Sequence, residues 1–221
     1  MNADFFRVLK NPVDFYIIRH GQSEGNAAQL FQGREESPLS EEGRLQAAAR
    51  GRSLKTALAG DGKTLLFSSP LGRAIETAEF IAKEAALSKP VFIDELLEMH
   101  LGIWSGKNWD EVKSEEPALW SAFMAKSWDA IPEAESSSIL YERALLAWAV
   151  LRDTALEQDA KNVISVSHGG LIQWLVKSTM QNHSWFPLLP IRNCGLFKFC
   201  VRPKEQGVYM CWEEFNSPIP S

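Results

Sequence analysis

The stretch VDFYIIRHG, residues 13–21, decides the fold prediction. Its first part is short, apolar and rich in β-branched and aromatic residues, which predicts a buried strand. A similar pattern recurs in NVISVSHGG, residues 162–170. Each segment ends on His-Gly, at His20 and at His168. Ligands of an open parallel sheet bind beyond the carboxyl ends of its strands, so we expect these two histidines to meet in one site.

Outward from these two segments, predicted strands and helices alternate along the chain. This order indicates a three-layer α/β/α sandwich, in which helices cover both faces of a mostly parallel sheet. We expect a single domain over residues 1–221, with 95–138 as a variable cap region. The other predicted elements are a loop over 21–39, helices over 40–58, 70–87, 115–126, 140–158 and 169–180, strands over 64–69 and 89–94, and a hairpin of 195–202 with 208–215.

Composition restricts the classes of partner. The chain has 221 residues, 45% of them hydrophobic, and a net charge of −5. An acidic balance argues against nucleic acid or an anionic membrane, and no run approaches the length of a membrane span. The N-terminus has no signal-peptide pattern, and the three cysteines form no CxxC pair. These features predict a cytoplasmic location. The oligomeric state is undefined, and a homodimer stays open.

Basic side chains gather at the same predicted sheet edge. Arg19 directly precedes His20, and Arg73 lies in SSPLGRA just beyond the strand at 64–69. A planar guanidinium donates two parallel hydrogen bonds, which suits an oxyanion with several acceptor oxygens. Two arginines and two histidines at one edge predict a local phosphate pocket within an acidic protein.

The four histidines could alternatively hold a metal ion. However, neither HxH nor HxxxH spacing occurs, and His100 and His183 lie in dissimilar contexts. We therefore predict no metal site. On spacing alone, Glu98 is no better a candidate for acid catalysis than its neighbour Glu95.

Five blocks, in order, resemble the signature of the histidine phosphatase superfamily, the family with the phosphoglycerate mutase-like fold. The similarity extends over about residues 13–200, nearly the whole chain. RHG alone would be a weak signal, whereas five blocks in sequence order are specific. The blocks are RHGQSEGN (19–26), PLSEEGRLQA (38–47), SSPLGRAIETA (68–78), LLEMHLGIWSG (96–106) and VISVSHGG (163–170).

The resemblance implies a role for each catalytic residue. His20 would be the nucleophile that forms a phosphohistidine. Arg19, Arg73 and His168 would bind the non-bridging oxygens and stabilise charge during transfer. Glu98 would protonate the leaving oxygen and then accept a proton from the attacking water. Phosphoryl transfer depends mainly on positioning and charge stabilisation, so this plan is chemically sound.

The resemblance also implies residues that bind the substrate. Asn26 would either donate to the phosphoryl group or orient His20. Gln32 and Gly33 fall where many members contact the substrate, and the backbone N–H of Gly169 could donate to the phosphate. The resemblance implies neither a metal nor another cofactor.

Two other functions remain open beside a phosphatase. Glu98 and His168 are 70 positions apart, as in the shorter phosphatase branch, whereas cofactor-dependent mutases carry a longer insert there. Phosphoglycerate mutase-type transfer and a non-catalytic phospholigand-binding module are the alternatives. Ser105, Glu76 and Ala134 depart from the family pattern, and none of these is a core catalytic position. The substrate is not defined by the sequence.

Overall fold

A computed structural model of the chain describes residues 1, 3–60 and 62–219. Its centre is a six-stranded sheet in the order β3-β2-β4-β1-β5-β6. The first four strands in this order are parallel, and β5 and β6 run antiparallel at the other edge. The strands are β1 (Val13–Arg19), β2 (Thr64–Ser68), β3 (Val91–Phe92), β4 (Asn162–Ser167), β5 (Leu196–Lys204) and β6 (Gly207–Ser217).

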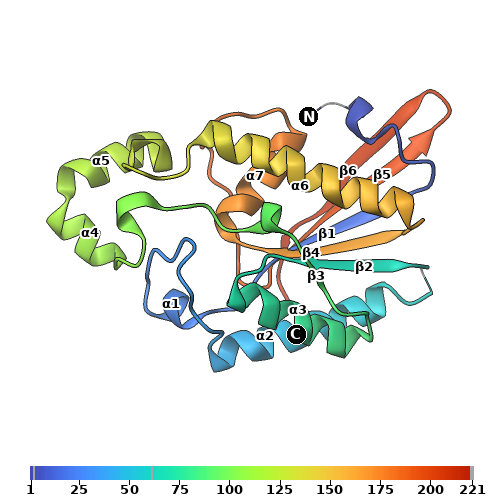
Figure 1. Ribbon diagram of the computed structural model, residues 1–221, viewed down its shortest axis with the longest axis horizontal. Helices are drawn as coiled ribbons and strands as arrows, with labels where there is room; N and C mark the ends of the chain where they lie inside the picture. The colour runs from blue at the N-terminus through green and yellow to red at the C-terminus, as the bar shows by residue number, and fades with distance from the viewer. Residues whose placement is uncertain (2, 61, 220–221) are drawn as a thin grey trace.

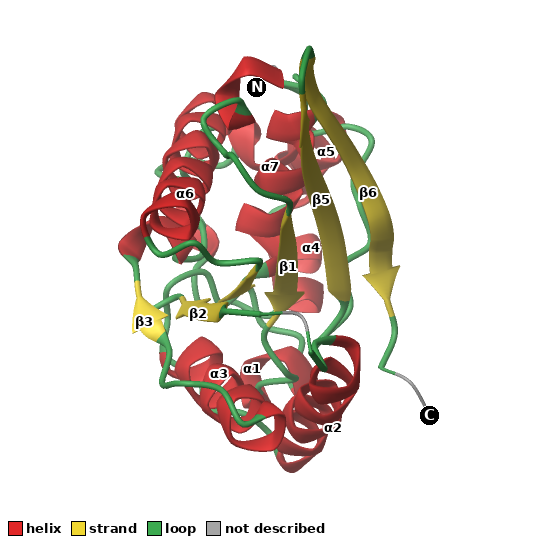
Figure 2. Ribbon diagram, turned by 90° about the vertical axis from the view of Figure 1, so that its right-hand side faces the viewer, coloured by secondary structure: helices red, strands yellow, loops and turns green. Residues whose placement is uncertain are grey.

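Helices cover both faces of this sheet (Figures 1 and 2). Helices α2 and α3 lie together on one face, and α6 and α7 lie on the other. The predicted three-layer α/β/α fold is therefore confirmed. The helices are α1 (Glu24–Ala27), α2 (Glu41–Ala57), α3 (Gly72–Ala85), α4 (Trp109–Glu115), α5 (Pro117–Lys126), α6 (Ser137–Glu157) and α7 (Gly169–Thr179), with 3-10 turns at Ala3–Phe6, Asp94–Leu96, Gly102–Trp104 and Ser127–Ala130.

Strand β1 supplies both hydrophobic layers. Phe15 and Ile17 pack into the cluster shared with α6 and α7, and Tyr16 and Ile18 pack into the cluster shared with α2 and α3. This alternation follows from the period of two along a strand. Because both faces of β1 are buried, its sequence is almost continuously apolar. The end of β1 is thereby held firmly where His20 follows it.

Capping residues fix the starts of two predicted helices. The Ser40 hydroxyl accepts a hydrogen bond from the Gly43 N–H at the start of α2, and Ser136 accepts one from Ile139 at the start of α6. Each serine satisfies a backbone donor that the first helical turn leaves free. The predicted helix around 70–87 begins later than expected, at Gly72, with Leu71 as its N-cap.

Three local predictions were wrong. The expected strand over 89–94 is reduced to Val91–Phe92, because this edge segment is exposed and turns at once into a 3-10 turn at Asp94–Leu96. One-turn α1 lies within the expected loop, where Ser23 and Asn26 form a capping box. The helix α4 was missed, although Asn108 caps it. Its polar sequence has little helical periodicity to signal it.

Residues 102–133, here called the excursion segment, leave the sheet region and return to the same place. Leu101 and Ala134 form an isolated antiparallel bridge, and the Glu135 N–H donates to the His100 carbonyl at 2.9 Å. Between these points the chain forms α4 and α5 at one end of the molecule (Figure 1). No helix in the described ranges is long and apolar enough to cross a membrane.

Candidate active site

His20 follows directly on β1 and is almost fully buried, at 2% exposure. Its Nδ1 lies 2.7 Å from the Gly21 carbonyl, which can only accept, so Nδ1 carries the proton. The lone pair is therefore on Nε2. The Arg73 Nε donates to this nitrogen at 3.3 Å. This arrangement presents an unprotonated nitrogen to the pocket, as nucleophilic attack requires.

The surroundings keep His20 neutral. Burial lowers the pKa of His20 well below its ordinary value of 6.5, and the positive charges of Arg19 and Arg73 lower it further. Burial also lowers the pKa of His168, together with the neighbouring His20 ring and the positive charges of Arg73 and Arg19. Both imidazoles are thus uncharged near pH 7 and keep a lone pair available.

Arg73 is held by the backbone of a neighbouring loop. It projects from the first turn of α3, and its Nη1 and Nη2 donate to the carbonyls of Glu35 and Gly33 at 2.8 and 2.6 Å. Gly33 adopts a φ of 52°, a conformation that favours glycine, and this turns its carbonyl toward the guanidinium. The contribution of Gly33 is therefore to orient Arg73 as well as to line the pocket.

Two buried nitrogen atoms in the site have no hydrogen-bond partner among the described residues. They are the Arg19 Nε and the His168 Nδ1. The His168 Nε2 lies 2.7 Å from the Ser69 hydroxyl, which already accepts a hydrogen bond from the Leu71 N–H. That hydroxyl can donate its own proton to Nε2, so the tautomer with a proton on Nδ1 is favoured. Both orphan atoms are then N–H donors.

Glu98 reaches the pocket from the loop after the 3-10 turn at Asp94–Leu96. Its carboxylate accepts three backbone hydrogen bonds, from Met99, Gly170 and Leu171, at 2.8, 3.0 and 3.1 Å. Two of these donors belong to the first turn of α7, where the helix dipole stabilises an anion. Gly170 permits this approach, because a Cβ there would lie 2.5 Å from Glu98 Oε1.

A cavity of about 270 Å³ collects most of the predicted site residues. It is lined by Arg19, His20, Asn26, Gln32, Gly33, Arg73, Glu98 and Gly169. His168 is fully buried and lies beside this cavity, with its ring centroid 5.1 Å from that of His20. The described residues contain no group of three His, Cys, Asp or Glu side chains that could hold a metal ion.

The family of this chain follows from its sequence similarity to known proteins. Residues 15–212 match the family described as "Histidine phosphatase superfamily (branch 1)". The chain belongs to the histidine phosphatase superfamily. It is 33% identical, over 82% of its length and 81% of the relative's, to a "Probable phosphoglycerate mutase GpmB" of Escherichia coli O1:K1 / APEC.

Solved structures of phosphatases and mutases resemble this histidine phosphatase superfamily member. A mycobacterial glucosyl-3-phosphoglycerate phosphatase in complex with VO3 superposes with a TM-score of 0.75 at 26% identity, covering 93% of this chain and 99% of that one. A phosphoglycerate mutase from Bacillus anthracis str. Sterne gives a TM-score of 0.73 at 28% identity, covering 94% of each chain. A solved phosphatase and a solved phosphoglycerate mutase are thus both similar to this chain.

Asn26 has a definite place in the histidine phosphatase site. Its Oδ1 accepts hydrogen bonds from the Ser23 N–H and from Asn193 Nδ2, which also lies 3.1 Å from the His20 carbonyl. With Oδ1 occupied, the amide nitrogen is the group that Asn26 can offer to the pocket. Gln32 accepts from the Ser23 hydroxyl through Oε1 and also lines the cavity.

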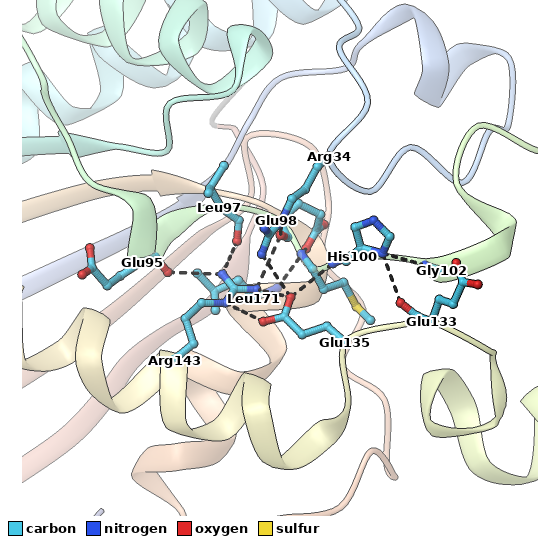
Figure 3. A network of polar contacts seen from close by, with 11 residues as sticks. Arg34, Glu95, Leu97, Glu98, His100, Gly102, Glu133, Glu135, Arg143 and Leu171 are labelled. Carbon is cyan, nitrogen blue, oxygen red and sulfur yellow. Dashed lines mark hydrogen bonds and ion pairs between the residues drawn. The ribbon is translucent and has the colours of Figure 1, made fainter.

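An ion-pair network positions the Glu98 loop (Figure 3). Arg143 reaches from α6 and donates to the carbonyls of Leu97 and Glu98. Its Nε and Nη2 pair with the two carboxylate oxygens of Glu135 at 2.8 and 2.9 Å. Glu135 also accepts from the His100 N–H, and Arg34 donates to the Glu98 carbonyl at 3.0 Å. A bidentate, mostly buried pair of this kind holds a loop in one geometry.

Sequence reasoning missed Asn193, Ser69, Glu135 and Arg143. Glu135, which directly follows the atypical Ala134, is central to the network around Glu98. The sequence carries no signal of these contacts, because Arg143 acts through the backbone carbonyls of Leu97 and Glu98.

Among the aromatic and histidine side chains of the segments around the cavity, most are packing groups. Trp109 lines the cavity. Trp104 is buried and donates to Glu116, and Trp185 packs edge-on against Trp174. His183 stacks on Tyr141 at 3.9 Å. Of these four residues, only Trp109 lines the cavity, and the other three are packing groups.

The lowered pKa values of His20 and His168 predict acid-sensitive stability. Both side chains stay neutral in the folded protein, whereas the unfolded chain takes up protons as pH falls below 6.5. The free energy of unfolding should therefore fall with pH below that value, by up to about 1.4 kcal/mol per pH unit for each histidine. Urea unfolding near pH 7 and near pH 5 measures this slope.

A pair of variants isolates the histidine contribution from that of the carboxylates. His168→Gln should have a shallower slope than the wild type, because one buried titrating group is gone. Gln206→Ala changes an exposed side chain that does not titrate and should keep the wild-type slope. Equal slopes in all three proteins would contradict the assignment of a neutral, buried His168.

Proposed function

We propose that this chain is a phosphatase that hydrolyses a phosphate monoester of a small metabolite through a phosphohistidine on His20. One observation carries the proposal. Two buried N–H donors without partners among the described residues, on Arg19 and His168, accompany the lone pair of His20. Leaving buried donors unpaired costs about 1–3 kcal/mol each, a cost that an incoming oxyanion removes. Orphan donors around a nucleophile describe a site shaped for a transferring phosphoryl group.

The first step transfers the phosphoryl group to the enzyme. The lone pair of His20 Nε2 attacks phosphorus, and the bond between phosphorus and the ester oxygen breaks. Arg19, Arg73, His168 and the Gly169 N–H bind the non-bridging oxygens. Glu98 in its protonated form donates its proton to the leaving oxygen, so that an alcohol departs. The Gly21 carbonyl stabilises the charge that develops on His20 by accepting from Nδ1–H.

The second step regenerates the enzyme. Water attacks the phosphohistidine, the bond between phosphorus and nitrogen breaks, and the Glu98 carboxylate takes the proton from the water. Inorganic phosphate leaves, and His20 recovers its lone pair. The same residue thus acts first as acid and then as base, as the reversal of the chemistry requires.

Phosphoglycerate mutase-type transfer is the second candidate, because the curated Escherichia coli relative bears the name of a probable mutase. A mutase would pass the phosphoryl group of His20 to a second hydroxyl in place of water. Measuring released phosphate against isomerised phosphoglycerate from the same incubation separates the two. Predominant isomerisation would overturn the phosphatase proposal.

Activity should not depend on a divalent ion. In the proposed mechanism two arginines and a histidine meet the charge of the phosphoryl group, so we expect hydrolysis of a nitrophenyl phosphate to survive exhaustive chelation. Vanadate mimics the trigonal-bipyramidal transferring group and should inhibit competitively. Complete loss of activity with chelator, followed by rescue with a divalent ion, would contradict this mechanism.

A cytoplasmic location is part of the same proposal. It is supported by the three cysteines, which are all free in the described residues, as expected in a reducing compartment. The proposed partner is the small phosphorylated substrate alone, with no nucleic acid or membrane.

A further inference from the structure

The cavity has two chemically different parts. The charged floor is deeply buried, with Arg73 at 1% and His20 at 2% exposure. The outer part carries a group of apolar side chains beside the amides of Asn26, Gln32 and Gln173, and Trp109 among them is 49% exposed. This apolar group, here called the outer subsite, includes Leu30, Phe31, Leu101, Trp109, Trp128 and Leu189.

The aromatic side chains of the outer subsite are held in place from behind. Phe31 is buried, and Trp109 stacks on it with ring centroids 4.8 Å apart. Trp128 meets Phe31 edge-on at 5.3 Å. Two indoles fixed against a buried ring form a rigid apolar surface, and such surfaces bind ligands with little loss of side-chain entropy.

The outer subsite offers no charge to a second anionic group. Among the described residues that line the cavity, Arg19 and Arg73 are the only cationic side chains, and both belong to the floor. Gln173 lines the cavity too, but its amide makes two hydrogen bonds with the backbone of Leu189. It donates to the carbonyl at 2.7 Å and accepts from the N–H at 3.0 Å. A carboxylate placed among these apolar side chains would lose its water without gaining a charged partner.

We infer that the outer subsite selects phosphate monoesters whose alcohol carries an uncharged apolar group, such as an aryl-alkyl or branched alkyl group, over phosphorylated hydroxy acids. The inference rests on the proposed phosphatase function and names its substrate class. The cavity volume of about 270 Å³ accords with it. An apolar cavity of about 150 Å³ holds a benzene molecule, so a ring and a phosphate fit together.

Three alkyl esters test this selectivity without altering the basicity of the leaving oxygen greatly: 2-phenylethyl phosphate, ethyl phosphate and 3-phosphoglycerate. Burying the phenyl group should raise kcat/KM for the first about 10- to 100-fold above each of the other two. Hydrolysis of 3-phosphoglycerate as fast as that of the phenylethyl ester would overturn the inference.

Matched variants assign the selectivity to the outer subsite. Trp109→Ala should lower the ratio of kcat/KM for phenylethyl over ethyl phosphate by about three- to tenfold. Phe92→Ala removes an equally exposed aromatic group, 48% exposed on β3 and outside the cavity lining, and should keep the wild-type ratio. An unchanged ratio in Trp109→Ala and Phe92→Ala alike would also overturn the inference.

A variant with an added positive charge tests the substrate class independently. Leu189→Lys places a cation in the outer subsite and should raise the relative kcat/KM for 3-phosphoglycerate at the expense of the phenylethyl ester.

Different outcomes contradict the substrate class and the proposed phosphatase function. Release of phosphate from ethyl phosphate with a preference for 3-phosphoglycerate would overturn only the substrate class. No phosphate release from any of the three esters would overturn the proposed function, and the inference with it.

Discussion

Replacing His20 with glutamine is expected to reduce phosphatase turnover by at least about 10⁴-fold, since the nucleophile and its intermediate are lost together. The geometry makes this side chain irreplaceable. Its Nδ1–H is fixed by the Gly21 carbonyl, and its Nε2 is left unprotonated beside Arg73. A glutamine amide has no nucleophilic nitrogen. The measurement is steady-state turnover of a nitrophenyl phosphate, with far-UV circular dichroism to establish that the variant folds.

Trapping the intermediate separates His20 from the second histidine of the site. Brief reaction of the wild type with labelled substrate should leave acid-labile, base-stable label on His20. His168→Gln should turn over slowly but still acquire label at His20, because His168 only donates to the phosphoryl oxygens. Label located on His168 in the wild type would reverse the two roles.

Glu98→Gln is expected to slow poor leaving groups far more than good ones. An alkyl ester releases a strongly basic alkoxide, so losing the acid should reduce its kcat/KM by about 10²–10⁴-fold. A nitrophenyl ester releases a stable phenolate and needs little protonation. The glutamine also places its amide NH₂ group against the backbone N–H groups of Gly170 and Leu171. In the wild type these groups donate to the Glu98 carboxylate. That disturbance affects both esters, so the diagnostic quantity is the ratio of their losses.

Glu95 provides the matched control for this experiment. It lies three positions before Glu98 in the same segment, is partly exposed and does not line the cavity. Glu95→Gln should behave nearly as the wild type with both esters. Equal losses for alkyl and nitrophenyl esters in Glu98→Gln would instead mean that Glu98 binds or positions the substrate.

The sequence predicted the parts of the fold that follow from local chemistry. Strand β4 has the predicted bounds, residues 162–167, because an apolar run that ends at a glycine-rich sequence leaves few alternatives to a buried strand. The convergence of His20 and His168 also followed from the rule for parallel strands, and their rings lie 5.1 Å apart. By contrast, β3 was overestimated, since an exposed edge segment cannot be recognised from composition alone.

The site's supporting contacts were beyond sequence reasoning for a physical reason. Glu98 and Glu95 have the same chemistry and similar neighbours, and only the packing of α7 against the loop brings amide donors to one of them. Arg143 likewise acts through backbone carbonyls at Leu97 and Glu98, which carry no signature in the side-chain sequence. Such contacts depend on how distant elements meet, which is a property of the assembled fold.

Because of the bridge between Leu101 and Ala134, the excursion segment is a unit that can be exchanged between related proteins. Its two ends meet, and its 106–109 part also hydrogen-bonds residues 28–31, so an exchanged 102–133 segment has to keep both sets of contacts. Glu135 and Arg143, which hold the acid in place, lie just outside it, whereas Trp109 and Trp128 lie inside. A chimera that carries a relative's segment between these anchors should therefore inherit a new preference for the alcohol while keeping the host's machinery for breaking the phosphate ester.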